Sequence, residues 1–502
     1  MSEYILGIDQ STQGTKALLF DQEGTLLARE DISHRQIVNP AGWVSHNPME
    51  IYHNVLQAIK NLVSKSGIRK SQIVCIGISN QRETSLVWDK KTGLPLDHAI
   101  VWQCARAAAV CEKLKKEGAA KFIQENTGLP LSPYFPAAKL AWFLENVPKL
   151  QKKAQKGQVC FGTMDTWLVY KLTQGNSYKT DYSNASRTQL FNLFTLQWDS
   201  EICQLFGVHP EQLPAICDSD SDFGETTLEG YLDAPIPIHA VLGDSHGALF
   251  GQGCLSKGMV KATYGTGSSI MMNIGAAPVS SSHGLVTSLA WKLKGKVSYV
   301  LEGNVNYTGA IISWLQHQAG LLASPEETEA LCRQACQHDT LYFVPAFTGL
   351  GAPYWEPDLK AALLGIDRNT GKKEIVKAGV EAIAYQIADV ISAMRQDTGI
   401  PVKLMRADGG PAQNTYLMQF QSSLLNAEIH VPDTKELSGM GAAYAAGFAM
   451  GLLPANLFEK KQFSMYRPAS DTDRIKAKYE GWKRAVRILL SGKEEKRKKD
   501  NE

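Results

Sequence analysis

Residues 5–20 read ILGIDQSTQGTKALLF, two apolar runs separated by a turn of small and hydroxyl-bearing side chains. The first run ends in Asp9, and the second follows Lys16. We expect two strands joined by a turn in which glycine lets backbone N–H groups approach an anion and threonine hydroxyls add uncharged donors. Lys16 adds positive charge beside this turn, and an exposed strand lysine without such a role is the alternative interpretation. The pattern is strand–turn–strand, unlike the strand–loop–helix of a Walker loop.

A related pattern recurs about half a chain later. Residues 259–272 read MVKATYGTGSSIMM, again two apolar runs around a Gly-Thr-Gly turn. Two such hairpins predict a duplicated architecture with one phosphate loop in each half. Either turn alone is equally well explained as an ordinary hairpin. Strands and helices alternate between the two hairpins, which favours an α/β fold. We place the domain boundary between residues 246 and 247, giving domains 1–246 and 247–502.

Composition narrows the class of protein. The 502 residues include 44% hydrophobic side chains, and 52 Lys and Arg balance 50 Asp and Glu to a net charge of +2. Wholesale disorder is excluded, and nothing favours a nucleic-acid-coating surface. The nine cysteines include no C-x-x-C pair, and the start lacks a signal-peptide pattern, so we expect reduced thiols and a cytoplasmic protein. The uncharged stretch 437–458 is rich in Ala and Gly, which predicts a buried helix and no membrane span.

Two carboxylates follow apolar strands beside these turns. Asp9 ends the first strand, and Asp244 follows the run IHAVLG at residues 238–243. Carboxylates in such places suit Mg²⁺–phosphate chemistry, because Mg²⁺ keeps several waters and takes one or two protein oxygens. A turn carboxylate with a purely structural role explains each one equally well.

A third set of side chains suits a polyhydroxylated substrate. Arg82 and Glu83 follow another apolar strand, and together they offer donors and acceptors to hydroxyl groups, each of which donates and accepts. A structural ion pair at a sheet end is the alternative. Trp102 and Tyr134 add aromatic area, which core packing explains nearly as well.

The order of these motifs resembles the FGGY family of carbohydrate kinases, which phosphorylate glycerol, pentuloses and related polyols. The resemblance is carried by GIDQSTQGTK, NQRETSLVWD, PYFPAAKLAWFLEN, GDSHGALFGQ, ATYGTGSSIMMN and DGGPAQNTYLMQFQS, and it extends from residue 5 to about residue 450. It implies two actin-like, ribonuclease-H-like domains with ATP and substrate between them. The first domain would carry the polyol site and one phosphate loop, and the second the nucleotide site and the other loop.

The resemblance also implies roles for individual residues. Asp244 matches the catalytic base, and Asp9 matches the carboxylate near Mg²⁺, with Asp244 as a second metal neighbour. The expected polyol site consists of Arg82, Glu83, Trp102, Tyr134, Asp244 and Ser245. The expected nucleotide and phosphate contacts are Thr12, Gln13, Gly14, Lys16, Thr266, Gly309, Ser313, Gly410 and Asn414. The expected reaction converts a small polyol and ATP, with glycerol the first choice, to sn-glycerol 3-phosphate and ADP. The family further suggests a homo-oligomer, a dimer or a tetramer.

Two departures from the family pattern leave the substrate open. Ser245 stands where Gln is usual, and Ser269 replaces an aromatic side chain, so the pocket has room for a larger and more polar substrate. A kinase of erythritol, a pentitol, ribulose or xylulose is therefore the alternative. A non-enzymatic, actin- or chaperone-like nucleotide switch is the remote alternative, because fold alone does not fix function.

Overall fold

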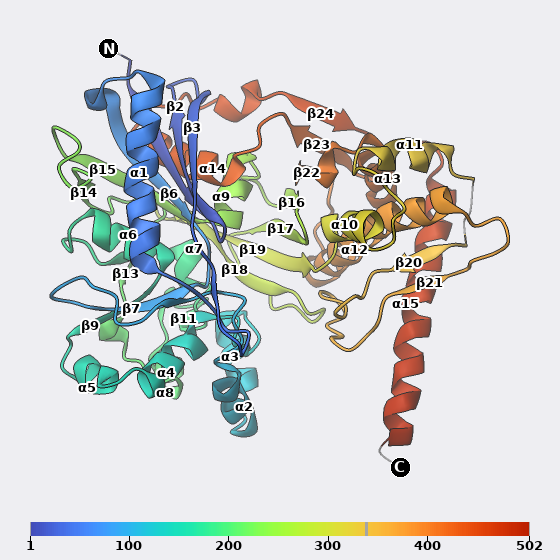
Figure 1. The fold of residues 1–502 in the computed structure, drawn as a ribbon, viewed down its shortest axis with the longest axis horizontal. Helices are drawn as coiled ribbons and strands as arrows, with labels where there is room; N and C mark the ends of the chain where they lie inside the picture. The colour runs from blue at the N-terminus through green and yellow to red at the C-terminus, as the bar shows by residue number, and fades with distance from the viewer. Residues whose placement is uncertain (1, 337–339, 501–502) are drawn as a thin grey trace.

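The computed structural model describes residues 2–336 and 340–500, which form two halves, each built on its own twisted sheet (Figure 1). The first half contains the N-terminus and lies on the left in Figure 1. The long helix α15 (Thr472–Asp500) projects from the second half. In the part of the chain described, no helix combines the length and apolar character needed to cross a membrane. The predicted boundary between residues 246 and 247 falls within α9 (Asp244–Gly251), and the division there stays a prediction.

The first sheet has six strands in the order β14-β15-β6-β1-β2-β3. The strands are β1 (Tyr4–Gln10), β2 (Gly14–Phe20), β3 (Leu26–Ser33), β6 (Ile73–Asn80), β14 (Glu225–Thr226) and β15 (Ile236–Gly243). The predicted first hairpin is β1–β2, which is antiparallel, and β1, β6 and β15 run parallel to one another.

The second sheet has seven strands in the order β18-β19-β17-β16-β22-β23-β24. The strands are β16 (Val260–Tyr264), β17 (Ser268–Gly275), β18 (Val286–Leu293), β19 (Lys296–Val305), β22 (Leu404–Gly409), β23 (Glu428–Pro432) and β24 (Phe463–Tyr466). An antiparallel meander β16–β17–β19 is followed by parallel β22 and β23, as β1–β2–β3 is followed by parallel β6 and β15. The shared topology agrees with the duplication predicted from the two hairpins.

Both faces of the first sheet are buried, and apolar side chains alternate between the two faces along its strands. In β1, Leu6 and Ile8 point to the side covered by α1 (Pro48–Ser66), whereas Ile5 packs on the side of α14 (Leu437–Ala449). Successive side chains of a strand point to opposite faces, so a strand covered twice is an almost continuous apolar run. The remaining helices near this sheet are α6 (Met164–Leu172), α7 (Tyr182–Ala185) and α9.

Helix α14 is the buried helix predicted within residues 437–458, and it ends at Ala449. Although it follows the second sheet in sequence, it packs against β1, β6, β15 and α9 of the first half. Its approach to α9 requires glycine, because a Cβ at Gly441 would lie 1.8 Å from the carbonyl oxygen of Gly247. Side chains of the second sheet, Met271 and Trp291 among them, join the same apolar cluster. The two halves therefore share a core around α14 and α9.

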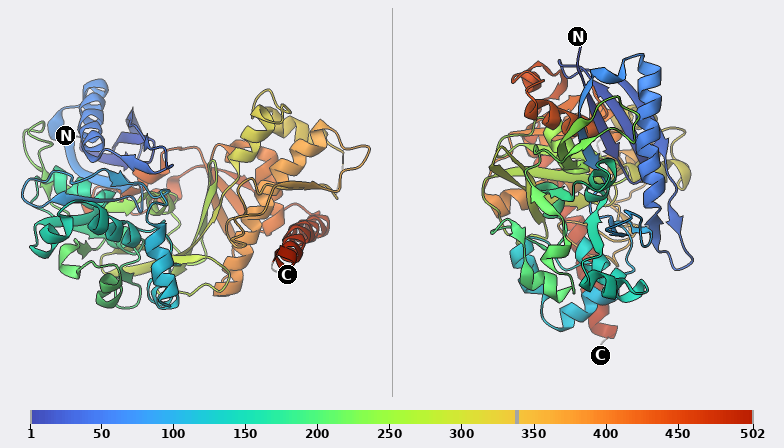
Figure 2. Two further views of the ribbon diagram at one scale, coloured as in Figure 1. Left: turned by 60° about the horizontal axis from the view of Figure 1, so that its bottom comes forward. Right: turned by 90° about the vertical axis from the view of Figure 1, so that its left-hand side faces the viewer.

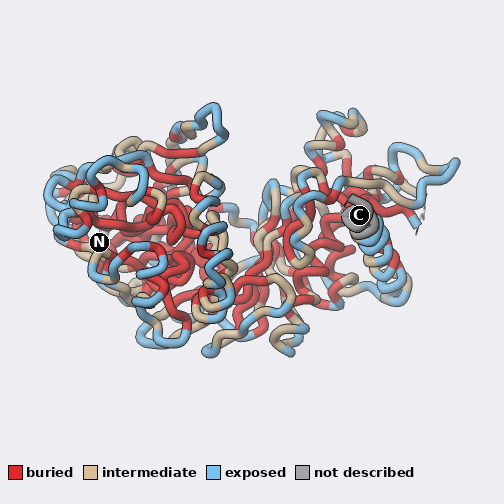
Figure 3. Tube along the Cα trace, turned by 90° about the horizontal axis from the view of Figure 1, so that it is seen from below, coloured by how far each residue is buried: buried red, intermediate tan, exposed pale blue. Residues whose placement is uncertain are grey.

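The second half is covered mainly by helices. They are α10 (Gly309–His317), α11 (Glu327–Gln334), α12 (Lys372–Thr398), α13 (Thr415–Leu425) and α15. The long helix α12 packs on β17 and β19 and lies within the largest buried cluster. The tube in Figure 3 shows buried chain concentrated inside each half and exposed chain at the periphery.

A smaller sheet and several helices complete the first half, and Figure 2 shows these helices in blue to teal. This sheet has the order β4-β5-β8-β7-β9, with β4 (Ile37–Val38), β5 (Val44–His46), β7 (Ser85–Asp89), β8 (Ala99–Ile100) and β9 (Val159–Thr163). The helices are α2 (Ala108–Lys116), α3 (Ala120–Thr127), α4 (Pro136–Asn146), α5 (Leu150–Gln155) and α8 (Ser200–Leu205). Two-stranded pairs in this half are β10 (Lys179–Asp181) with β13 (Ala215–Cys217) and β11 (Phe191–Asn192) with β12 (Gln197–Trp198). In the second half, β20 (Tyr342–Val344) pairs with β21 (Ala362–Leu364).

Candidate active site

Three predicted residues meet at one edge of the first sheet. Asp9 lies at the end of β1, Arg82 follows β6, and Asp244 follows β15. Because these strands are parallel and adjacent, their carboxyl ends lie side by side, the usual place for a site in an α/β sheet. Asp244 begins helix α9, and about a third of its side chain is exposed, so it is accessible to a ligand.

Asp9 lies in an electrostatically unusual position. Its Oδ1 accepts a 3.1 Å hydrogen bond from Ser79, and its Oδ2 lies 3.9 Å from the Lys16 ammonium. The pKa of Asp9 is raised to about 6, chiefly by burial, with Lys16 lowering it and the charge of Asp244 adding to the rise. A carboxylate that loses solvation close to a second carboxylate favours a nearby cation.

Lys16 is held chiefly by a residue from the other end of the chain. Its ammonium lies 2.7 Å from Oε2 of Glu436, which precedes α14, and the other Glu436 oxygen is paired with Arg29. Glu436 is buried, although Lys16 is partly exposed. Thus the lysine beside the first turn is paired with a carboxylate on the segment that joins the second sheet to α14.

Arg82 reaches across to the second sheet. Its Nη1 and Nη2 each donate a 2.9 Å hydrogen bond to the carboxylate of Glu302 on β19, and its Nε lies 3.1 Å from Asp244 Oδ1. The Nε contact is an ion pair without hydrogen-bond alignment, so this buried N–H lacks a partner among the described residues. A Cβ at Gly243 would lie 2.7 Å from Arg82 Cγ, so glycine there leaves room for the side chain.

Glu83 has an uncommon backbone conformation. Its φ of 57° is in the left-handed region, which costs free energy in residues other than glycine and is concentrated at functional sites. Its Oε1 accepts a 2.6 Å hydrogen bond from Arg187 Nε, and both side chains are buried. The turned backbone therefore directs the carboxylate toward a buried arginine and places it beside Arg82.

The two predicted aromatic residues lie together next to the first turn. The Trp102 and Tyr134 rings are 5.6 Å apart, and Trp102 Nε1 donates a 2.9 Å hydrogen bond to Thr12 Oγ1. Beneath them the buried Lys139 donates to the carbonyl oxygens of Glu83, at 3.4 Å, and Tyr134. Burial lowers the pKa of Lys139 to about 7. The aromatic pair, the turn and Glu83 thus form one connected arrangement.

Five of the residues predicted to contact nucleotide or phosphate lie in the second half, near the ends of strands of the second sheet. The exposed Thr266 lies in the β16–β17 turn, and its carbonyl accepts from the N–H groups of Thr308, at 2.9 Å, and Ala310, at 3.1 Å. Gly309 begins α10, and a Cβ there would lie 2.7 Å from the Gly265 carbonyl oxygen. Ser313 is exposed one turn further along α10.

The remaining second-half candidates follow β22. Gly410 is exposed directly after this strand, and Asn414 caps α13 by accepting a 3.0 Å hydrogen bond from the Leu417 N–H. In the first half, Gly14 begins β2 and Gln13 is exposed in the turn before it. The turns after the corresponding strands β1 and β16 therefore both carry predicted phosphate residues, and the other second-half candidates follow β19 and β22.

The two serines that depart from the family pattern have different surroundings. Ser269 Oγ donates a 3.3 Å hydrogen bond to Glu302 Oε1, so this short side chain contacts the carboxylate that holds Arg82. The Ser245 backbone N–H donates a 2.6 Å hydrogen bond to Asp244 Oδ1, and its side chain is half-buried. Both serines lie beside residues of the expected polyol site.

Two buried residues that contact the predicted site, Arg187 and Glu302, are absent from the set expected from the sequence. Arg187 lies after α7, and its Nη1 is 3.0 Å from Glu302 Oε2 in addition to its bond to Glu83. A signal for Glu302 was present, because it is a charged residue inside the otherwise apolar run YVLEGNV at 299–305. Arg187 stands in a polar stretch, where no periodicity distinguishes it from a surface residue.

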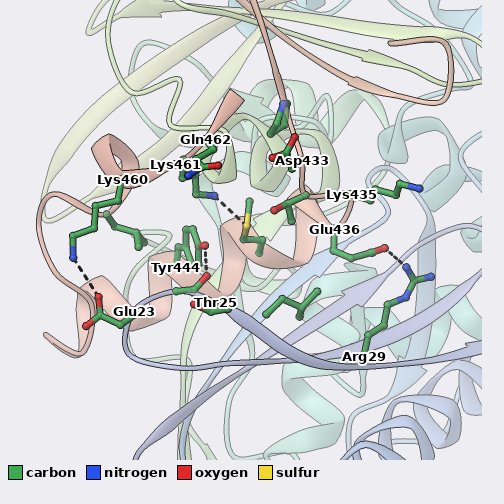
Figure 4. Close-up of a pocket in the computed structure, with 16 residues that line it drawn as sticks. Glu23, Thr25, Arg29, Asp433, Lys435, Glu436, Tyr444, Lys460, Lys461 and Gln462 are labelled. Carbon is green, nitrogen blue, oxygen red and sulfur yellow. Dashed lines mark hydrogen bonds and ion pairs between the residues drawn. The ribbon is translucent and has the colours of Figure 1, made fainter. Parts of the chain in front are cut away.

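A cavity of about 530 Å³ lies away from these residues, beside the β2–β3 hairpin and the N-terminal end of α14 (Figure 4). Arg29, Glu436, Tyr444 and Lys461 are among its lining residues, and Figure 4 shows the Arg29–Glu436 contact at one side. Its connection with the site is Glu436, whose other oxygen contacts Lys16. The cavity is therefore separate from the place where Asp9, Arg82 and Asp244 meet.

Comparison with known proteins defines the class. Models of the N-terminal and C-terminal domains of the FGGY family of carbohydrate kinases match residues 4–251 and 260–450, so the chain belongs to this family. The predicted α/β fold of two actin-like domains and the predicted phosphotransferase class are confirmed. A non-enzymatic nucleotide switch is accordingly not supported.

The similar proteins include several glycerol kinases. The chain is 45% identical to glycerol kinase 1 of Thermotoga maritima, covering 97% of this chain and 100% of that one. It is 43% identical to the glycerol kinase of Alkaliphilus oremlandii, covering 99% of each. The crystal structure of Plasmodium falciparum glycerol kinase with ADP superposes with a TM-score of 0.91 at 35% identity, covering 97% of this chain and 98% of that one.

Proposed function

We propose that this protein transfers the γ-phosphoryl group of ATP to glycerol, giving sn-glycerol 3-phosphate and ADP. The observation that carries the proposal is the juxtaposition of Arg82, Glu83 and Asp244 at one sheet edge, with Trp102 and Tyr134 beside them. Full-length similarity to glycerol kinases supports the same substrate. The buried Nε–H of Arg82, which is close to Asp244 but makes no aligned hydrogen bond among the described residues, adds support, because a substrate hydroxyl would supply an acceptor for it.

In this proposal Asp244 is the general base. The attacking hydroxyl would give its proton to the Asp244 carboxylate as its oxygen forms a bond to the γ-phosphorus and the bond to the β-phosphate oxygen breaks. Arg82 and Glu83 would bind the other hydroxyls as donor and acceptor, and Trp102 would pack against the carbons. Holding both reactants in line contributes about 7–11 kcal/mol in well-oriented systems, so positioning would supply much of the acceleration.

Nucleotide and metal would be bound by the two turns and the acidic edge. Thr12, Gln13, Gly14 and Lys16 would contact phosphates from the first half. From the second half, Thr266 would contact phosphate, and Gly309, Ser313, Gly410 and Asn414 the remainder of the nucleotide. Mg²⁺ fits beside Asp9 and Asp244, because Asp9 is destabilised as an anion by burial and by the second carboxylate. The ion would supply charge neutralisation for the phosphates.

A polyol panel tests the substrate assignment. We expect ATP-dependent ADP formation to be stimulated by glycerol, with a higher kcat/KM than for erythritol, xylitol, ribitol, D-ribulose or D-xylulose. The alternative is a larger polyol or ketose, favoured by the short side chains of Ser245 and Ser269 beside the site. A glycerol kcat/KM more than ~10²-fold below that of a larger substrate would overturn the glycerol assignment. Cytoplasmic location and assembly as a dimer or a tetramer stay predictions from the sequence.

A further inference from the structure

Two buried residues outside the predicted site hold the pair that is expected to bind the polyol. Glu302 accepts two 2.9 Å hydrogen bonds from Arg82, and Arg187 donates a 2.6 Å hydrogen bond to Glu83. Arg187 and Glu302 also pair with each other, with Nη1 3.0 Å from Oε2. These three ion pairs link the four side chains in the order Arg82, Glu302, Arg187 and Glu83, with alternating charge. Arg82 and Glu83 are neighbours in sequence, so the backbone closes this series into a ring.

The ring is buried as a unit. The exposed fraction is 6% for Arg82, 2% for Glu83, 1% for Arg187 and 0% for Glu302. Buried charges are tolerated when each is paired, and removing one partner leaves an uncompensated charge, which is strongly destabilising. The formal charges of the four groups sum to zero, so the ring contains no uncompensated net charge.

The ring also determines which atoms of the pair remain for a ligand. Glu302 engages both terminal nitrogens of Arg82, and this orients the Nε edge toward Asp244. Arg187 engages Oε1 of Glu83, whereas Oε2 accepts no hydrogen bond from the residues that the structure describes. One donor edge and one acceptor oxygen are thus held at fixed positions beside the expected base, and this geometry suits a hydroxyl adjacent to the one that reacts.

The members of the ring come from distant parts of the fold. Arg82 and Glu83 follow β6 of the first sheet, Arg187 follows α7, and Glu302 lies in the interior of β19 of the second sheet. The orientation of Arg82 therefore depends on how the second sheet is placed against the first. The ring connects polyol binding to the arrangement of the two halves.

We propose that Arg187 and Glu302 are positioning residues that set the affinity for the polyol and its discrimination by the hydroxyl next to the reacting one. The proposal rests on the proposed phosphorylation of glycerol. It assigns no contact with substrate to either residue, because both act through Arg82 and Glu83. Their effect should appear in the KM for polyol and in the preference between polyols, and much less in the KM for ATP.

The experiment compares glycerol with 1,3-propanediol, which lacks the middle hydroxyl, in the full-length protein and its variants. For Glu302→Gln we expect a rise of at least tenfold in the KM for glycerol and less than threefold in the KM for ATP. The ratio of kcat/KM for glycerol to that for 1,3-propanediol should fall at least tenfold. The preference for glycerol depends on hydrogen-bonding groups that are correctly placed for the middle hydroxyl. Glu302→Asp, which keeps the charge, should recover part of both losses.

Glu381→Gln is the matched control. Glu381 is also a buried carboxylate, with the Lys478 ammonium 2.6 Å and 2.7 Å from its two oxygens, but it lies on α12, in the helical layer of the second half. We expect this variant to lower the melting temperature and to leave both the glycerol KM and the preference ratio within threefold of wild type. A general loss of stability is thereby separated from a loss of positioning.

Arg187→Lys tests the proposal if Glu302→Gln fails to fold. Lysine keeps the positive charge but lacks the planar guanidinium group whose separate N–H groups contact Glu83 and Glu302. A folded variant at either position with an unchanged glycerol KM and an unchanged preference ratio would overturn the proposal. Wild-type ADP formation that no polyol stimulates would instead refute the proposed function, and this is established before any variant is compared.

Discussion

Trp102 Nε1 donates a 2.9 Å hydrogen bond to Thr12 Oγ1. A side chain expected to line the polyol site is therefore hydrogen-bonded to the turn expected to bind phosphate. The two residues are 90 positions apart in the chain. The contact places the wall that would hold the carbons beside the loop that would hold the γ-phosphate. Transfer needs this proximity, since the attacking oxygen and the phosphorus must approach to about 3–3.5 Å.

Trp102→Phe should remove the hydrogen bond to Thr12 while keeping an aromatic ring against Tyr134. A neutral hydrogen bond contributes about 0.5–1.5 kcal/mol, so we expect kcat/KM for glycerol to fall about 2–10-fold. Steady-state kinetics with a coupled ADP assay measures this. Trp142→Phe, at a tryptophan that packs on Trp43 elsewhere in the first half, is the control and should leave kcat/KM unchanged. An unchanged value in Trp102→Phe would show that the bond has no part in catalysis.

Asp244→Asn should remove the proposed base and preserve the shape of the side chain. General-base catalysis contributes about 10²–10⁴-fold, so we expect kcat to fall by at least 10²-fold. Calorimetric titration should give an ATP affinity within threefold of wild type, because the residues expected to bind the nucleotide do not include Asp244. A kcat within tenfold of wild type would refute the role of Asp244 as base.

Lys139→Met should change the pH dependence of stability. Burial lowers the pKa of Lys139 to about 7, well below the ~10.4 of an unfolded chain. Between these values the unfolded state binds more protons, so wild-type stability gains up to about 1.4 kcal/mol per pH unit from this residue as pH rises from 7 to 10.

Urea unfolding at pH 6, 7, 8 and 9 measures this effect. The Met variant lacks the gain, so its stability relative to wild type should be greatest at pH 6–7 and should decline toward pH 9. Lys139→Arg, which stays charged throughout this range, should lack the gain as well. Parallel pH profiles for wild type and Lys139→Met would contradict the prediction.

Glu436→Gln should remove the ion pair between Glu436 and the Lys16 ammonium. The Glu436 carboxylate competes with a bound triphosphate for this ammonium, so we expect the KM for ATP to fall up to about threefold. Because Lys16 and Arg29 are partly exposed, the lost pairs should lower the free energy of unfolding by only about 1 kcal/mol. Kinetics and urea unfolding test the two effects separately. A rise in the KM for ATP would indicate that Glu436 orients Lys16 toward the nucleotide.

Several elements could be predicted from sequence because their signals are local. The β1–β2 and β16–β17 hairpins have apolar runs interrupted by small and hydroxyl residues, and the uncharged segment at 437 has the composition of a buried helix. Arg82 and Asp244 were recognisable as polar residues directly after apolar strands. These patterns depend on neighbours within a few positions, where strand alternation and turn chemistry act.

Other features depend on contacts between distant segments. Composition alone could not show that α14 packs on the first sheet, since this depends on the match of Gly441 to Gly247 across nearly 200 positions. Glu436 looked like any surface carboxylate until the fold placed it against Lys16. Helix packing and ion pairing between residues so far apart produce no periodic pattern in a single sequence.

The sequence by itself determined the two hairpins around Gly- and Thr-containing turns, the α/β class and, through the resemblance, the family and the residues expected to act. Only the tertiary structure decided how those residues are held. It brought Glu302 from the second sheet to Arg82, turned Glu83 at a φ of 57° toward Arg187, and bonded Trp102 to Thr12. The physical reason is that a buried charge must be paired, and the partner that pairs it is chosen by packing in three dimensions.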